Sequence, residues 1–258
     1  MNGNEMLKKS VILHIVLLTL LCLVTVDVAA KNFVVVIDPG HGGDKPGAVF
    51  PARRPVVFEK QINFAVSKLL YNKLKAESNG ITAILTRNKD VDVPFTTRAN
   101  AANDINANLF MSIHCNSVKN PTTYGASVVV MNEKQMADLD VKYDEITRIE
   151  RLENFDRSLK MSEYVIEELS QTAGRKILHS GFVQVPNRDL AVLRMTIPPS
   201  IIVELDFISN KETREFLTSE EGQEKLADAL YNSIIKFRDY ISKLDGVEFG
   251  NDSDKIEK

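Results

Sequence analysis

The chain has 258 residues, of which 44% are hydrophobic and 26% are charged, and its formal net charge is −3. This is the composition of an ordinary globular protein, and one domain accounts for the length once the terminal segments are set aside. Because there is no excess of basic residues to bind a polyphosphate backbone, the charge argues against nucleic acid as a partner.

The first thirty residues have the pattern of an export signal. Two lysines precede a mostly apolar run from Val11 to Val26, and the small residues Val28–Ala30 follow. This order predicts a signal peptide over residues 1–30. A retained membrane anchor is the alternative, but the run is shorter than the ~20 residues that a spanning helix needs. A lipoprotein site at Cys22 is disfavoured because Leu21 stands where a small residue is wanted. We therefore expect an exported protein, periplasmic or secreted, without a retained anchor.

Apolar runs and amphipathic stretches alternate along the rest of the chain. Continuous apolar runs are typical of strands covered on both faces, and apolar residues spaced by three and four are typical of helices. In chain order we predict a strand at 33–37, a helix at 59–75, a strand at 81–86, a helix at 97–107, strands at 109–115 and 126–131, a polar, largely helical segment at 133–172, a strand at 201–205 and a helix at 226–241. These elements place a catalytic domain at residues 31–244 and a disordered polar tail at 245–258.

This alternation predicts an α/β fold, a three-layer αβα sandwich in which helices cover both faces of a largely parallel sheet. In such sheets the functional groups gather at the carboxyl ends of the strands. His41 follows the first strand within a glycine-rich loop, and His114 ends the third. Glu204 lies near the end of the last strand, and Glu59 begins the first helix. Four groups able to bind metal or move protons are thus expected at one edge.

Histidine and carboxylate side chains are common ligands of catalytic zinc, but each residue has a simpler interpretation. A single histidine is more often structural, and Glu59 could serve only to interact with its helix dipole. The glycines around His41 could form a plain turn, although both phosphate-binding fingerprints are missing. Glu204 interrupts an apolar stretch, where an unpaired charge is costly, so it either pairs with a cation or faces a functional cleft. The spacing is compatible with a zinc hydrolase.

Five blocks of the sequence resemble zinc-dependent N-acetylmuramoyl-L-alanine amidases of the cell-wall amidase family, amidase type 3. In order, they read VVVIDPGHGG, FEKQIN, TRNKDVDVPFTTRANAAN, NLFMSIHCNS and VLRMTIPPSIIVELDFISNKE. The resemblance spans Phe33 to about Phe237. It implies a mixed, mostly parallel six-stranded sheet flanked by helices, and an enzyme that cleaves peptide stems from peptidoglycan during cell-wall remodelling or daughter-cell separation.

Carried over by position, the resemblance implies that His41, Glu59 and His114 hold one zinc ion per chain. It implies that Glu204 is the catalytic acid and base. The bond cleaved would be the amide between the lactyl group of N-acetylmuramic acid and L-alanine.

Two positions depart from the family pattern. Asp206 stands where the family usually has glycine, and Gln61 stands where an aspartate is common. Since neither is an implied ligand, we expect them to affect fine geometry and substrate preference before activity.

Several other polar residues could support the site. Asn116 could bind substrate or simply form a turn, and Arg194 could meet a carboxylate of the peptide stem. Arg87 and Arg98 are interpreted as structural ion-pair partners rather than substrate clamps. His179 is interpreted as a surface histidine.

The charged segment 133–172 has two interpretations. It is either a solvated helix that packs on the sheet or a regulatory helical insertion over the zinc cleft. In the second case Glu145, Glu150 or Glu153 would occupy the open zinc position as an autoinhibitory ligand.

Two other functions stay open. One is a non-catalytic wall-binding or activating protein on the amidase fold, which the presence of all four implied groups argues against. The other is a zinc peptidase with a different amide substrate, because fold and metal do not fix the substrate. Peptidoglycan is the expected partner, together with a possible protein activator, and the oligomeric state is open.

Overall fold

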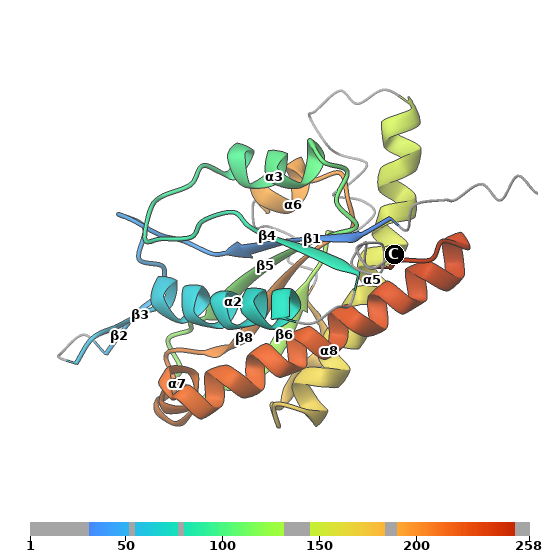
Figure 1. Cartoon of the computed structure of the whole chain (residues 1–258). Coiled ribbons are helices and arrows are strands. Elements are labelled where there is room, and N and C mark those ends of the chain that lie inside the picture. Colours follow the sequence, from blue (N-terminus) through green and yellow to red (C-terminus); the bar gives the residue numbers. More distant parts are fainter. Residues whose placement is uncertain (1–30, 52–54, 77–79, 132–144, 184–189, 251–258) are drawn as a thin grey trace, which may run out of the picture. The chain divides into compact units, whose positions relative to one another are not determined.

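A mixed β-sheet positions the candidate site residues (Figure 1). The computed structural model describes residues 31–51, 55–76, 80–131, 145–183 and 190–250. The strands of the described sheet are β1 (Phe33–Pro39), β4 (Ile81–Leu85), β5 (Leu109–Asn116), β6 (Ala126–Val129), β7 (Ile177–Val183) and β8 (Ser200–Phe207), in the spatial order β4-β1-β5-β8-β6-β7. Two short strands, β2 (Val49–Phe50) and β3 (Val57–Phe58), pair with each other in a separate antiparallel ribbon.

The four strands on one side of the sheet are parallel. β1 pairs in parallel with β4 and β5, and β5 pairs in parallel with β8. β6 runs antiparallel to β8 and parallel to β7. The predicted mixed, mostly parallel six-stranded sheet is therefore confirmed. Because β1, β5 and β8 are parallel neighbours, their carboxyl ends lie at one edge.

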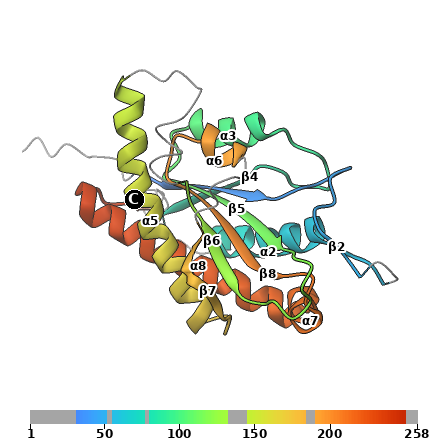
Figure 2. The same ribbon diagram turned by 180° about the vertical axis from the view of Figure 1, so that it is seen from behind.

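Helices cover both faces of this sheet, as the αβα prediction requires. α3 and α6 lie on one face, and α2 and α8 lie on the other (Figures 1 and 2). α5 and α7 also contribute buried residues to the core on the α2 and α8 face. The bounds are α2 (Glu59–Ala76), α3 (Phe95–Asn103), α5 (Glu145–Gln171), α6 (Ala191–Met195), α7 (Lys211–Thr218) and α8 (Glu220–Asp245).

Successive side chains of a strand point to opposite faces, so β1 contributes to two cores. Val35 and Ile37 belong to the large core beneath α2 and α8. Val36, between them, belongs to the smaller core beneath α3 and α6. This burial on both faces explains why β1 appears in the sequence as an uninterrupted apolar run. The described residues from 31 to 250 belong to one compact unit that contains both cores.

The helix boundaries differ from the predicted ones where capping residues decide them. α8 begins earlier than predicted because the Ser219 side chain accepts a hydrogen bond from the Gly222 amide. It ends at Gly246, which adopts the left-handed conformation with a φ of 63°. α3 follows Pro94 and ends at Asn103, short of the predicted 107.

The first residues of the predicted polar tail, 245–250, are among the described residues. The Phe249 ring packs edge-on against Phe33, with ring centroids 5.1 Å apart, so the described chain continues to residue 250. Residues 251–258 lie outside the described residues, as do residues 1–30 with the predicted export signal. Among the helices that are described, none is long and apolar enough to cross a membrane.

Candidate metal centre

The loop after β1 brings the two candidate histidines together. His41 follows the end of β1 in the left-handed conformation, with a φ of 61°. This conformation is uncommon outside glycine, although histidine adopts it more often than most residues. Gly40 allows the His114 ring to lie close to this loop, because a Cβ atom at position 40 would be 2.3 Å from Cε1 and Nε2 of that ring. The two imidazole rings lie 4.9 Å apart between centroids.

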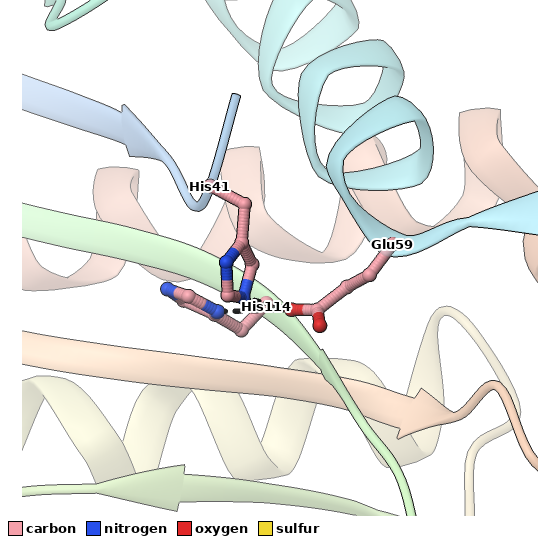
Figure 3. Close-up of side chains that lie close together, drawn as sticks. All are labelled: His41, Glu59 and His114. Atoms are coloured by element: carbon pink, nitrogen blue, oxygen red, sulfur yellow. Dashed lines mark hydrogen bonds and ion pairs between the residues drawn. The ribbon is translucent and has the colours of Figure 1, made fainter. Parts of the chain in front are cut away.

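Glu59 brings a carboxylate to both histidines from the first turn of α2 (Figure 3). Its Oε1 atom lies 3.2 Å from Nε2 of His41 and 2.9 Å from Nδ1 of His114. The three candidate ligand atoms lie within 4.8 Å of one another. Two imidazole nitrogens and one carboxylate oxygen form a donor set that zinc binds in catalytic sites. The residues therefore fit a metal ion, and they form a possible metal site.

Main-chain donors fix the orientation of the Glu59 carboxylate. The Ala48 amide donates to Oε2 at 2.8 Å, and the Cys115 amide donates to Oε1 at 3.2 Å. Gly47 leaves room for this arrangement, since a Cβ atom there would lie 2.4 Å from Oε2 of Glu59 and 2.7 Å from Cδ2 of His41. A glycine therefore stands where two candidate ligands leave no space for a side chain.

The same contacts shift the pKa values of the ligands. Burial alone would raise the pKa of the Glu59 carboxyl, but hydrogen bonds with His114 and His41 outweigh it and hold that pKa well below its usual range. Burial alone would lower the pKa of His114, but its hydrogen bond to Glu59, together with the negative charges of Glu59, Glu204 and Asp38, outweighs burial and raises that pKa. Burial raises the pKa of the Cys115 thiol, which keeps it protonated and unsuited to ligation.

Glu204 lies beside this cluster. It pairs in register with His114 across β5 and β8, and it is only 6% exposed. With His41 and His114 it lines a cavity of about 370 Å³. The lining also includes apolar side chains, among them Phe95, Val129, Val192 and Ile202. The arrangement places a further carboxylate next to the possible metal site, inside a cavity large enough for part of a substrate.

Comparison with known proteins identifies the family. Residues 35–236 match the family model described as N-acetylmuramoyl-L-alanine amidase, and this stretch is well over half of the chain. The chain belongs to the N-acetylmuramoyl-L-alanine amidase family. The resemblance inferred from the five sequence blocks is thus confirmed.

Individual amidases are similar over most of this chain. The N-acetylmuramoyl-L-alanine amidase AmiC of Neisseria meningitidis serogroup B is 29% identical over 79% of the chain, which spans about half, 52%, of that relative. Among solved structures, the amidase AmiC2 of Nostoc punctiforme is 28% identical, with a TM-score of 0.65 over 82% of this chain and 99% of that one. The CwlD amidase of Clostridioides difficile, solved in complex with the GerS lipoprotein, is 27% identical, with a TM-score of 0.63 over 81% of this chain and all of that one.

In the structure, the two weaker substrate-binding candidates have local contacts. The side chain of Asn116 accepts a hydrogen bond from the Ser117 amide at 2.8 Å, as a turn-forming asparagine does. Arg194 lies on α6, next to the Leu190–Val192 segment that lines the cavity. Its carbonyl accepts a hydrogen bond from Arg151 of α5. Substrate contacts by Asn116 and Arg194 stay predictions.

The predicted autoinhibitory residues belong to α5. Glu150 and Glu153 are exposed on this helix, and neither is among the described residues that line the metal cavity. The Glu145 side chain lies outside the described residues, as does that of His179. α5 itself packs on the sheet, where Met161, Val165 and Leu169 are fully buried in the large core. In the structure, α5 therefore packs on the sheet, as a helix without a regulatory role would. A regulatory insertion over the zinc cleft stays a prediction.

Some cavity residues were absent from the sequence prediction. The apolar wall contributed by α6 was missed because this helix has only five residues, too few for a recognisable periodicity. Asp38 was also missed, although it is a buried carboxylate at the end of an apolar strand. That position carries the same signal of a costly buried charge that drew attention to Glu204.

Proposed function

We propose that the chain is a zinc-dependent hydrolase that cleaves the amide bond between N-acetylmuramic acid and L-alanine in peptidoglycan. The observation that carries this proposal is the convergence of candidate ligand atoms of His41, Glu59 and His114 within 4.8 Å, beside a cavity that is lined by His41, His114 and Glu204. The match to the amidase family over residues 35–236 supports the choice of substrate.

In this proposal His41, His114 and Glu59 would hold the ion. When bound, zinc supplies Lewis acidity, which polarises a carbonyl group and lowers the pKa of water towards ~7. The low pKa of Glu59 keeps its carboxylate ionised for ligation at any physiological pH. The main-chain amides of Ala48 and Cys115 hold that carboxylate in one orientation.

Glu204 supplies the proton transfers. Its carboxylate accepts a proton from the water molecule as the water oxygen forms a bond to the amide carbon. The same proton then passes to the leaving nitrogen of L-alanine as the carbon–nitrogen bond breaks. The position of Glu204 supports this role, because it lines the cavity and pairs in register with His114 without belonging to the three-ligand cluster.

The cavity offers a substrate both apolar and polar contacts. Val129, Val192 and Ile202 form an apolar part of its wall, while His41 and His114 are polar lining residues. A lactyl methyl group and the side chain of L-alanine are small apolar groups on either side of the proposed scissile amide. We infer that this wall orients them, and that the glycan continues outside the cavity.

The remaining parts of the proposal concern place and partners. The pattern of residues 1–30 supports export, with the periplasm as the simplest location. The complex of the CwlD relative with a lipoprotein supports a search for a protein partner here as well.

The test is digestion of purified peptidoglycan by residues 31–258, with mass spectrometry of the products. Stem peptides that begin with L-alanine, lost on addition of a chelator and restored by Zn²⁺, are the expected result. The Glu204→Gln variant, loaded with zinc, is the matched control and should release none. Cleavage of another amide would replace this proposal with a zinc peptidase. Binding without any cleavage, in the presence of candidate protein partners too, would replace it with a wall-binding protein.

A further inference from the structure

Two buried arginines lie against the loop that carries His41. The main-chain carbonyls of three consecutive residues, Pro39, Gly40 and His41, all accept hydrogen bonds from guanidinium groups. The donors are Arg87 and Arg98, which are each only 3% exposed. Two buried guanidinium groups thus hold the main chain of residues 39–41 in place.

Arg98 spans the loop from one end to the other. Its Nη1 atom donates to the Pro39 carbonyl at 2.9 Å, and its Nη2 atom donates to the His41 carbonyl at 2.8 Å. Nη1 also lies 2.6 Å from Asp38, and Nε donates to the Val93 carbonyl at 2.9 Å. The expected ion pair of Arg98 is therefore present, but it is only one of four contacts.

Asp38 is itself held in place. The hydroxyl groups of Thr86, just after β4, and of Ser112, in β5, both donate to its carboxylate. Asp38 is 1% exposed, so the ion pair that it forms with Arg98 is screened from water. The position of Arg98 is thus determined by three neighbouring strands of the sheet.

Arg87 holds the same loop from another side. Its Nε atom donates to the Pro39 carbonyl at 2.9 Å, and its Nη2 atom donates to the Gly40 carbonyl at 3.1 Å. Nη2 also donates to the Lys60 carbonyl in the first turn of α2, one residue after Glu59. Arg87 therefore connects the loop of one candidate ligand to the helix turn that carries another.

We propose that Arg87 and Arg98 are positioning residues that hold His41 in its ligating conformation. The inference rests on the proposed function only in taking His41, Glu59 and His114 as metal ligands. His41 adopts a φ of 61°, a conformation that non-glycine residues rarely keep unless the surroundings fix it. The two guanidinium groups fix it, so the ordering of the loop is complete before a metal ion binds.

Arg98 also lines the cavity, but the hydrogen bonds of both arginines are made within the chain, which favours the positioning role over a direct contact with substrate. The bonds of Arg98 are directed at the main chain and Asp38, and those of Arg87 are directed at main-chain carbonyls. A lysine keeps the charge but has a single ammonium group, which cannot reproduce a planar fork that reaches two separated carbonyls. Arginine-to-lysine variants therefore test the positioning role without removing the charge.

The experiment measures the zinc dissociation constant of Arg98→Lys by competition with a chromogenic chelator. We expect binding to weaken by roughly 10- to 100-fold, as for the loss of other groups that orient metal ligands. The visible absorption spectrum of the Co²⁺-loaded variant should also change, because it reports the ligand geometry directly. Both readouts are independent of catalytic activity.

Arg151→Lys is the matched control. Arg151 is 5% exposed and donates to two main-chain carbonyls, those of Thr196 and Arg194, in the connection between α6 and β8. It should lose stability in thermal unfolding but bind zinc within about twofold of the parent chain. Equal loss of zinc affinity in Arg98→Lys and Arg151→Lys would overturn the proposal, because the loss would then follow general destabilisation.

Two further variants cover the case in which Arg98→Lys does not fold. Arg87→Lys removes the second fork, and Ser112→Ala removes only one donor to Asp38 and should weaken zinc binding by a few fold. Zinc binding within twofold of the parent chain in the folded members of this set would refute the positioning role. If the parent chain itself binds no zinc, the proposed metal centre fails instead, and the two failures are thereby distinguished.

Discussion

Replacing Gly40 by alanine should displace a candidate metal ligand by a calculable distance. The new Cβ atom would lie 2.3 Å from the His114 ring, whereas ordinary van der Waals contact begins near 3.4 Å, so the ring must move by at least 3.4 − 2.3 = 1.1 Å. Metal sites hold their ligand distances within about 0.2 Å. We therefore expect zinc affinity to fall by more than about tenfold, which corresponds to about 1.4 kcal/mol.

The assay is chelator competition for zinc, with thermal unfolding of the metal-free protein measured in parallel. Crowding at Gly40 should cost about 1–3 kcal/mol of folding stability. Gly246→Ala is the control, because Gly246 has a φ of 63° and a Cβ atom there would have no neighbour within 4 Å. It should cost roughly 1–2 kcal/mol through backbone strain alone and leave zinc binding unchanged. A folded Gly40→Ala protein that binds zinc as tightly as the parent chain would refute the reasoning.

Three further outcomes are expected. Glu204→Gln should keep its zinc and lose about 10²–10⁴-fold in turnover of muropeptides, and loss of zinc together with turnover would instead make Glu204 a ligand. In the metal-free protein, the stability contributed by the Glu59–His114 pair should be complete between pH 4.5 and 6.5, the ordinary pKa values of the two groups. The Glu59 contribution is lost as pH falls towards its lowered pKa, and the His114 contribution is lost as pH rises through its raised pKa, so the melting temperature of Glu59→Gln should depend less on pH. Met161→Ala, at a fully buried position of α5, should cost about 2–5 kcal/mol, and a smaller loss would mean that α5 is dispensable for the fold.

The sequence predicted the sheet best where strands are buried on both faces. β1, β5 and β8 are continuous apolar runs because one set of side chains packs under α2 and α8 and the alternate set packs under α3 and α6. The edge strand β7 was missed, since Ile177–Val183 mixes apolar residues with histidine, serine and glycine. α6 and α7 were missed because five and eight residues give too little periodicity to recognise.

The candidate site was predictable in part for a topological reason. Parallel strands end at one edge, so His41, His114 and Glu204 could be placed together from strand order alone. Glu59 was expected at the same edge because it begins the first helix, but its close approach to the histidines depends on the connection between β1 and α2. That connection includes the β2–β3 ribbon, and Gly47 leaves the space in which the Glu59 carboxylate lies. Such close packing is a tertiary property, and only the resemblance to the amidase family pointed to Glu59 as a ligand.

Asp206 shows how a departure from the family pattern can be accommodated. It replaces the usual glycine two residues after Glu204, where a carboxylate could have disturbed the charge of the site. Instead, Asp206 is 1% exposed and accepts hydrogen bonds from the amides of Gly125 and Phe207, each at 2.7 Å. Arg175 lies 3.3 Å away as an ion-pair partner.

These contacts connect the end of β8 to the residues that precede β6 and β7. Burial raises the pKa of Asp206 above its ordinary value, while its three partners act in the opposite direction. Asp206 does not belong to the cluster formed by His41, Glu59 and His114. Its side chain is instead engaged in contacts that connect the strand carrying Glu204 to neighbouring segments of the fold.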